Sequence, residues 1–155
     1  MALAERIEPQ SKEPLRLWLR LLTCATAIEK KARAMLAERF GTTLPRFDVL
    51  AALDRARDGL TMGELSAQLL VSNGNVTAIV ARLVQDGLVT QAQDRDDRRI
   101  LRVKLTPKGR RDFRLYAAEH ERWIEQLLSN LNEREIQDLL AGLARVKTSI
   151  ERSGL

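Results

Sequence analysis

Apolar residues near the start of the chain predict a long helix that is buried on more than one side. Between residues 15 and 36 they fall on several faces of a helix: Leu15, Leu17, Trp18, Leu19, Leu21, Leu22, Ala25, Ile28, Ala32, Met35 and Leu36. A helix of about 25 residues also exceeds the common length in globular proteins. We therefore expect this helix to pack partly on its own domain and partly on a second copy of the chain.

Shorter helices are predicted to follow. Thr43 and Pro45 are typical of a helix start, and residues 61–64 (Thr-Met-Gly-Glu) form a capping box that starts the next helix. Ser72 can cap another helix, which extends to Gln85. The apolar positions of that helix have the spacing of one helical face: Val76, Ile79, Val80, Leu83 and Val84.

The hydrophobic period then changes from that of a helix to that of a strand. Residues 88–93 form one expected strand, and in residues 100–105 Leu101, Val103 and Leu105 alternate on one face. The six residues between the strands, 94–99, are all charged (Asp-Arg-Asp-Asp-Arg-Arg). The pattern predicts a β-hairpin with a charged tip.

Two more helices complete the chain, one starting at Pro107 and one capped by Asn132 with Glu135. Their expected apolar faces contain Phe113, Tyr116, Ala117, His120, Trp123, Ile124, Leu127, Leu128, Ile136, Leu139, Leu140, Leu143, Val146 and Ile150. No linker is long enough to separate two domains. The fold class is therefore mainly α with a small β-hairpin, in one domain of 155 residues.

Composition excludes several classes of protein. A single cysteine and a single histidine, Cys24 and His120, argue against a disulfide framework, a zinc cluster and a histidine-based active site. No Gly-rich phosphate loop is present, and the arginines among Asp94, Asp96 and Asp97 would repel a metal ion. We expect neither an enzyme nor a metal or cofactor. With no signal peptide or membrane span apparent, we expect a cytoplasmic protein.

The net charge of +5 is concentrated in one segment. Residues 82–114 contain ten Lys and Arg against five Asp and Glu, whereas the other 122 residues balance at 16 against 16. A local positive excess favours a polyanionic partner.

Short helices followed directly by a charged hairpin predict a winged helix-turn-helix. The polar face of the helix from Ser72 to Gln85 suits the major groove of DNA, and arginines in the tip suit a minor groove. An aspartate beside an arginine can hold the guanidinium in one orientation. The alternatives are an ordinary surface helix and a solvated, self-neutralising turn.

The chain resembles the MarR (multiple antibiotic resistance regulator) family of transcriptional regulators over nearly its whole length. Residues 97–102 fit the family pattern D-x-R-x-x-R and continue into Val-Lys-Leu-Thr-Pro-Lys-Gly at 103–109. Residues 60–65 and 71–77 also look like the family. The resemblance implies a homodimer on a palindromic operator. Residues 45–106 would form the winged helix-turn-helix lobe, and residues 12–40 and 107–152 the dimerisation helices.

The resemblance also implies residue roles in DNA binding. Arg99 would enter the minor groove and Asp97 would steady it, while Arg102 would contact phosphate or brace the wing. Ser72 would combine capping with a phosphate contact. The other expected DNA-binding residues are Asn73, Asn75, Thr77, Arg82, Arg95 and Arg98.

Members of the family commonly respond to a small effector, and repression is their usual mode. Residues 40–50 resemble a branch that controls the breakdown of aromatic acids or their CoA thioesters, which we expect as the effector. The candidate pocket residues are Trp18, Leu22, Arg46, Phe47, Phe113, Tyr116 and His120. The alternative for the apolar members is core or dimer packing. For His120 it is a hydrogen-bonded histidine at an interface, and for Arg46 a plain surface position.

Two other functions compete with a ligand-released repressor. One branch of the family senses peroxide through a cysteine on the first helix, but Cys24 lies among small and apolar residues without a nearby base, which favours a packed thiol. A winged helix can also serve as a protein-interaction module without a DNA role. The basic wing argues against the second alternative.

Overall fold

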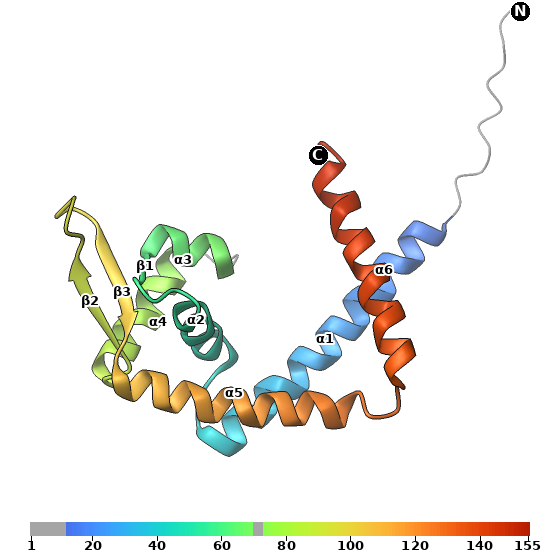
Figure 1. Ribbon diagram of the computed structural model, residues 1–155, viewed down its shortest axis with the longest axis horizontal. Coiled ribbons are helices and arrows are strands. Elements are labelled where there is room, and N and C mark those ends of the chain that lie inside the picture. Colours follow the sequence, from blue (N-terminus) through green and yellow to red (C-terminus); the bar gives the residue numbers. More distant parts are fainter. Residues whose placement is uncertain (1–11, 70–72) are drawn as a thin grey trace, which may run out of the picture. The chain divides into compact units, whose positions relative to one another are not determined.

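The protein is described by a computed structural model that covers residues 12–69 and 73–155 (Figure 1). Its elements are α1 Glu13–Phe40, α2 Leu44–Asp54, β1 Leu60–Thr61, α3 Met62–Leu69, α4 Asn73–Gln85, β2 Val89–Gln93, β3 Leu101–Leu105, α5 Pro107–Leu127 and α6 Glu133–Arg152. The chain forms two compact units, residues 1–116 and 117–155, which are described separately. The predicted fold class, mainly α with a small hairpin, is confirmed.

Local capping chemistry sets most helix ends where the sequence predicts them. Gly41 follows α1 with a φ of 60°, in the left-handed region that ends helices. The Thr43 hydroxyl accepts a hydrogen bond from the Arg46 amide at 3.3 Å, and Thr61 and Glu64 form the predicted reciprocal box. Asn132 caps α6 with Glu135 in the same way. The predicted cap Ser72 lies outside the described residues.

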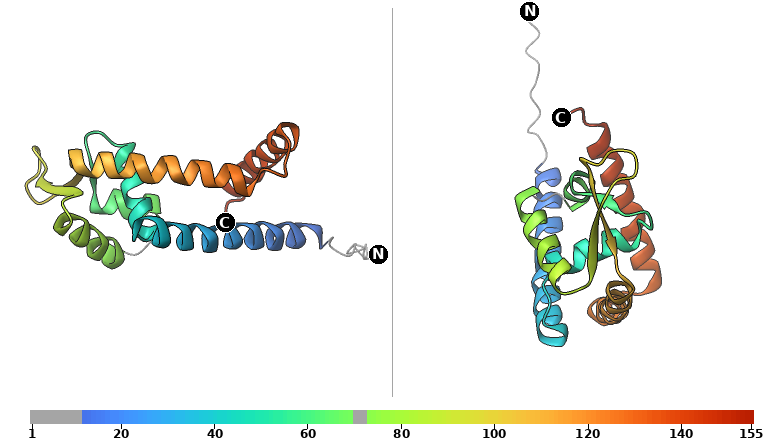
Figure 2. Two further views of the ribbon diagram at one scale, coloured as in Figure 1. Left: turned by 90° about the horizontal axis from the view of Figure 1, so that it is seen from below. Right: turned by 90° about the vertical axis from the view of Figure 1, so that its left-hand side faces the viewer.

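The sheet contains a strand that the sequence analysis missed. Besides the predicted hairpin β2–β3, Leu60 pairs with Val103 and Thr61 with Arg102, which gives the antiparallel order β1-β3-β2. A two-residue strand shows no alternation, and Thr61 already serves as the cap of α3. The hairpin projects beyond α2–α4 (Figure 2).

The core lies among α2, α3, α4 and the sheet, where the largest fully buried side chains include Leu50, Leu53, Leu65, Leu83 and Val103. Two predicted core positions were wrong. Val84 is 39% exposed because it lies at the edge of the apolar face of α4, whose centre is formed by the buried Val76, Val80 and Leu83. Leu101 is 43% exposed because it borders the hairpin tip. The sequence placed both residues on the correct apolar face, but it did not show where along that face the side chains stop being buried.

The start of α5 is packed directly onto the turn after α4. The Thr106 amide donates to the Leu88 carbonyl at 3.0 Å, and its hydroxyl donates to the Gly87 carbonyl at 2.6 Å. The same hydroxyl accepts from the Gly109 amide at 2.9 Å. This junction fixes where β3 ends and α5 begins, and so positions the wing.

Large apolar side chains remain exposed on the outer helices. None of the residues of α6, all within the described range, is buried. The exposed side chains are Leu15, Leu17, Trp18, Leu19 and Leu22 in α1, and Leu139, Leu140, Leu143 and Ile150 in α6. No helix within residues 12–69 and 73–155 has the length and apolar character needed to cross a membrane.

Candidate nucleic-acid interface

Helix α4 presents a small, mostly uncharged face to solvent. Val76, Val80 and Leu83 are fully buried, which fixes the rotation of the helix about its axis. The exposed positions on the other side are Asn75, Thr77, Ala78, Ala81, Arg82 and Gln85. Ser72 and the side chain of Asn73 lie outside the described part. Side chains of this size and polarity can approach the edges of bases in a major groove.

The wing tip, residues 94–99, is built around the carboxylate of Asp94. That carboxylate accepts hydrogen bonds from the backbone amides of Asp96 at 3.1 Å and Asp97 at 3.2 Å. It also accepts one from the Nε of Arg102, across the base of the tip. Asp94 was not among the predicted site residues, although an Asp at the start of a turn is a known turn-forming signal.

Asp97 holds Arg99 through both its backbone and its side chain. The Asp97 Oδ1 accepts from the Arg99 amide at 3.0 Å and from its Nε at 3.2 Å, and Oδ2 accepts from Nη2 at 3.3 Å. The resemblance to the MarR family implied that Asp97 steadies Arg99, and this forked contact is consistent with that role. The Arg99 side chain is nevertheless 91% exposed. The guanidinium is therefore oriented by its neighbour and still open to a partner.

These contacts favour the ionised form of both carboxylates. The hydrogen bond from the Arg99 side chain lowers the pKa of Asp97 below its usual 3.8, and the Arg102 side chain lowers the pKa of Asp94 in the same way. The contact with Asp94 correspondingly raises the pKa of Arg102. Of the two roles considered for Arg102, contacting phosphate or bracing the wing, its bond to Asp94 suits the bracing role. The side chains of Arg95 and Arg98 are exposed.

A long-range ion pair links the start of α2 to the residue after α4. Arg46 Nη2 lies 2.6 Å from Asp86 Oδ2, and the Arg46 side chain is only 20% exposed. The hydrogen bond from Arg46 is the largest cause that lowers the pKa of Asp86. Lys108 adds a bond from its ammonium to the Asp86 carbonyl. Arg46 is therefore a paired residue, contrary to the plain surface position considered above, and the sequence did not reveal its partner.

The candidate effector residues fall into different surroundings. Phe47 and Phe113 are buried core residues whose ring centroids lie 5.5 Å apart. Tyr116 packs on Phe40 at 4.6 Å, and burial raises its pKa. Trp18 and Leu22 are exposed on α1 in the same unit. His120 belongs to the second unit, where its ring lies 6.3 Å from that of Trp123.

Cys24 is an exposed free thiol within this chain. The expected packed thiol is therefore wrong for the single chain, because the helix around Cys24 exposes its apolar side chains as well. In the described part of the chain, no cluster of His, Cys, Asp or Glu side chains is placed to hold a metal ion.

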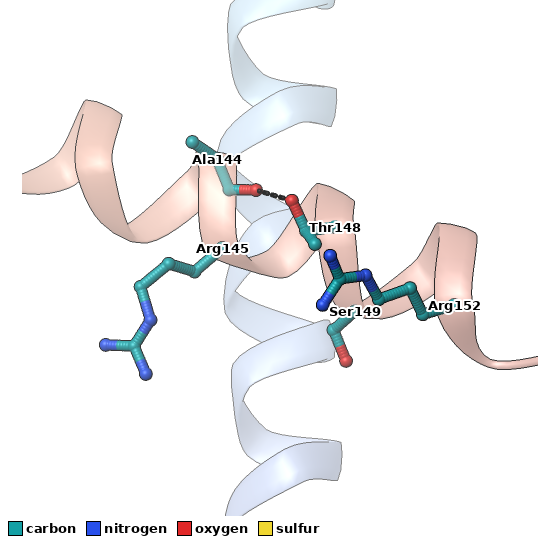
Figure 3. A pocket seen from close by; sticks show the side chains of 5 residues that line it. All are labelled: Ala144, Arg145, Thr148, Ser149 and Arg152. Atoms are coloured by element: carbon teal, nitrogen blue, oxygen red, sulfur yellow. Dashed lines mark hydrogen bonds between the residues drawn. The ribbon is translucent and has the colours of Figure 1, made fainter.

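A shallow groove along α6 contains two arginines. It is lined by Ala144, Arg145, Thr148, Ser149 and Arg152, and the Thr148 hydroxyl donates to the Ala144 carbonyl at 3.1 Å (Figure 3). The two arginine side chains extend in different directions in Figure 3. They do not converge on one point, so the groove does not form a defined anion site.

Comparison with known proteins agrees with this architecture. A sequence profile of the MarR family matches residues 40–100. The transcriptional activatory protein BadR of Rhodopseudomonas palustris is 31% identical over 141 residues, which cover 88% of this chain and 79% of that protein. A MarR family transcriptional regulator from Silicibacter pomeroyi has a similar structure, with a TM-score of 0.78 at 31% identity, over 92% of this chain and 99% of that one.

A further solved structure shares the fold at lower identity. FabT of Streptococcus pneumoniae, solved in complex with DNA, superposes with a TM-score of 0.73 at 24% identity, over 88% of this chain and 96% of that one. The relatives from Rhodopseudomonas palustris and Silicibacter pomeroyi are named as transcriptional regulators. The chain belongs to the MarR family of winged-helix, DNA-binding transcriptional regulators.

Proposed function

We propose that the protein is a homodimer that binds a palindromic operator through two copies of its winged lobe, residues 45–106. Residues 12–40 and 107–152 form the dimerisation helices in this proposal. Exposed leucines on α1 and α6 support it, because apolar patches of this kind mark interaction surfaces. A two-fold symmetric dimer requires two related half-sites in the DNA.

The observation that carries the DNA-binding assignment is the exposed guanidinium of Arg99, held by Asp97. Narrow minor grooves attract arginine because their negative potential is enhanced. A guanidinium that is already oriented loses less conformational entropy on binding. Arg99 therefore enters the minor groove in this proposal, and Arg95 and Arg98 contact the neighbouring phosphates.

Helix α4 occupies the major groove in the same proposal. Asn75, Thr77 and Arg82 contact base edges, with Asn73, while Ser72 contacts a phosphate. Arg102 keeps the tip in shape through Asp94. FabT, which shares this fold, was solved in complex with DNA, and this supports DNA binding by a protein of this fold.

The effector in this proposal is an aromatic acid or its CoA thioester, and its binding releases a repressor from the operator. Arg46 acts electrostatically on Tyr116, and a guanidinium near an aromatic ring complements the two parts of an aromatic anion. In this proposal the anion shares the Arg46 guanidinium with Asp86. The relative from Rhodopseudomonas palustris is named an activatory protein, so the sign of regulation is measured with a promoter–reporter fusion.

The DNA assignment is tested with an operator selected from a random-sequence pool. We expect Arg99→Ala to weaken binding by about 1–3 kcal/mol, with the loss concentrated at A·T-rich outer positions of the half-site. Fluorescence anisotropy at fixed salt measures this. Arg134→Ala removes the same charge from α6 and serves as the control. Unchanged affinity of the Arg99 variant would contradict the assignment of the wing.

A further inference from the structure

Helix α2 carries two charges at the ends where its own dipole disfavours them. Arg46 lies in the first turn, and Asp54 is the last residue of the helix. The start of a helix has a partial positive charge and its end a partial negative one, so a cation at the start and an anion at the end are both unfavourable. Within residues 44–54, all of them described, the first turn has no acidic residue and the last turn no basic one. Such charges are favourable only with partners outside the helix.

Both charges have a partner, and both partners lie next to the wing. The Arg46 Nη2 lies 2.6 Å from Oδ2 of Asp86, the residue that follows α4. The Asp54 Oδ1 accepts a hydrogen bond at 3.4 Å from Nη1 of Arg110, in the first turn of α5. Arg46, Asp54 and Arg110 are half-buried. Salt screens partly buried pairs less than exposed ones.

The stretch between the two partners contains the whole wing. Residues 86–88 lead from α4 into β2, and residues 106–110 lead from β3 into α5. The Lys108 ammonium donates to the Asp86 carbonyl at 3.1 Å and joins the two connections, as do the bonds of Thr106 described above. Helix α2 is therefore bonded to the chain just before the wing and just after it.

We propose that these two ion pairs fix the position of the wing relative to α4, so that α4 reaches the major groove while Arg99 reaches the minor groove. Arg46 and Asp54 are positioning residues in this role: they touch no DNA and hold the two connections from which the wing extends. Two groove contacts that are positioned beforehand lose less conformational entropy on binding. The inference rests on the proposed DNA binding and adds the residues that make its two contacts simultaneous.

The sign of the effect separates positioning from simple electrostatics. Asp86→Ala and Asp54→Ala each remove a negative charge from the lobe, and attraction to phosphate alone would make both variants bind the selected operator more tightly. Loss of positioning acts in the opposite direction, and we expect each variant to bind about 3–10-fold more weakly. Fluorescence anisotropy at fixed salt, without added aromatic acid, measures this. Glu38→Ala makes the same charge change at an exposed position of α1 and should not weaken binding.

A double-mutant cycle tests whether the pair acts through the wing. The loss expected above for Arg99→Ala corresponds to about 5–150-fold in affinity. In the Asp86→Ala background the same change should cost at least about threefold less, because residues that act together are not additive. If the Asp86 pair only stabilised the fold, Arg99→Ala would have the same effect in both backgrounds.

Exchanging the charges of the first pair provides a rescue. Arg46→Asp combined with Asp86→Arg reverses the pair and places an acid in the first turn of α2, where the helix dipole favours it. We expect the operator affinity of this double variant to return to within about threefold of the wild type, since the contact between the two connected elements is restored.

Hydrogen exchange detects the loss of positioning without DNA. The Leu88 amide donates to the Leu83 carbonyl, and the Thr106 amide donates to the Leu88 carbonyl. We expect both amides to exchange about tenfold faster in Asp86→Ala and Asp54→Ala, through local opening of the connections. The amide of the buried Leu50 should keep its rate, which distinguishes local opening from a general loss of stability.

Three results would overturn the inference. They are operator binding by both alanine variants that is unchanged or tighter, an undiminished effect of Arg99→Ala in the Asp86→Ala background, and unchanged exchange at Leu88 and Thr106. A wild-type protein that binds no operator from the pool would instead contradict the proposed function, and with it the role of the pairs in DNA binding. That result is obtained before any variant is compared, so the two failures are distinct.

Discussion

The six consecutive charged residues of the wing tip have two roles. Some form hydrogen bonds within the turn, and others are exposed to solvent. A run of this composition is consistent with a solvated, self-neutralising turn, and the sequence leaves that alternative open. In the structure, Asp94 and Asp97 accept the backbone amides of the turn and hold Arg102 and Arg99. Asp94 and Asp97 therefore shape the tip, whereas Arg95, Arg98 and Arg99 are exposed together with Asp96.

The wing tip should be insensitive to pH until the solution is strongly acidic. Because Asp94 and Asp97 have pKa values below the usual 3.8, their contacts contribute stability that is present above that value and is lost as the pH falls through the lowered pKa. We expect the carboxyl groups of both residues to titrate in NMR experiments with midpoints below 3.8. The backbone amide signals of the tip should stay constant between about pH 5 and pH 8. In Arg99→Ala, the midpoint of Asp97 should rise while that of Asp94 stays low. Equal midpoints in both proteins would contradict the forked contact.

The sequence did not predict contacts between residues that lie far apart in the chain. Asp97 and Arg99 lie two positions apart, and the resemblance to the MarR family implied their contact. Arg46 and Asp86 lie 40 positions apart and meet only because α2 packs beside the end of α4. No periodicity encodes such a pair in a single sequence. The wing was therefore predicted in more detail than the surroundings of the effector candidates.

At the scale of elements, the predicted helix starts are confirmed where hydrogen bonds between neighbouring residues determine them. Capping boxes at Thr61 and Asn132 determine their helix starts through neighbours three residues away. Strand β1 depends instead on pairing with Val103, far along the chain, and was missed. Val84 continues the apolar pattern of α4 but lies at the edge of the buried face. Tertiary packing decided both of these outcomes.

The junction between the α4–β2 turn and α5 leaves no room for a side chain at Gly109. A Cβ there would lie 1.9 Å from the Leu88 carbonyl oxygen and 2.8 Å from its carbon, both backbone atoms. We expect Gly109→Ala to destabilise the protein by about 1–3 kcal/mol or more, since the helix must move away from the turn. Urea denaturation measures the change in the free energy of unfolding.

Gly63→Ala provides the matched control for that substitution. Gly63 lies in α3 of the same unit, and its Cβ would be in ordinary contact with Thr61 Oγ1 at 4.0 Å. An added methyl group in a helix stabilises it by up to about 1 kcal/mol. If both variants unfolded at the same urea concentration, the close packing at Gly109 would not be a determinant of stability.

At the scale of the whole molecule, helices α1 and α6 expose many large apolar side chains, and clusters of such side chains mark interaction surfaces. Leu139, Leu140 and Leu143 of α6 are each about half exposed, and Leu15 and Trp18 of α1 are similar. The sequence predicted this, because the first helix is apolar on several sides. The proposed dimer would cover these side chains, and the stability of the folded chain would then depend on protein concentration.

The dimer can be tested on α6 with two substitutions that differ only in the face they alter. Leu143→Glu places a charge in the apolar stripe of α6, whereas Ala141→Glu places it on the opposite side of the helix. We expect the wild-type protein and Ala141→Glu to sediment at twice the chain mass of 17.5 kDa. Leu143→Glu should shift the equilibrium towards the monomer by about tenfold or more, because an unpaired charge is costly to bury.

Operator binding connects this dimer to DNA. A monomer makes contacts with one half-site only, so the affinity of Leu143→Glu for the selected operator should fall, and the slope of log K against log salt should become shallower by roughly half. A wild-type protein that is monomeric at micromolar concentration would contradict the proposed dimer. So would a Leu143→Glu variant that keeps both the dimer mass and the steep salt dependence, because the exposed stripe of α6 would then have another role.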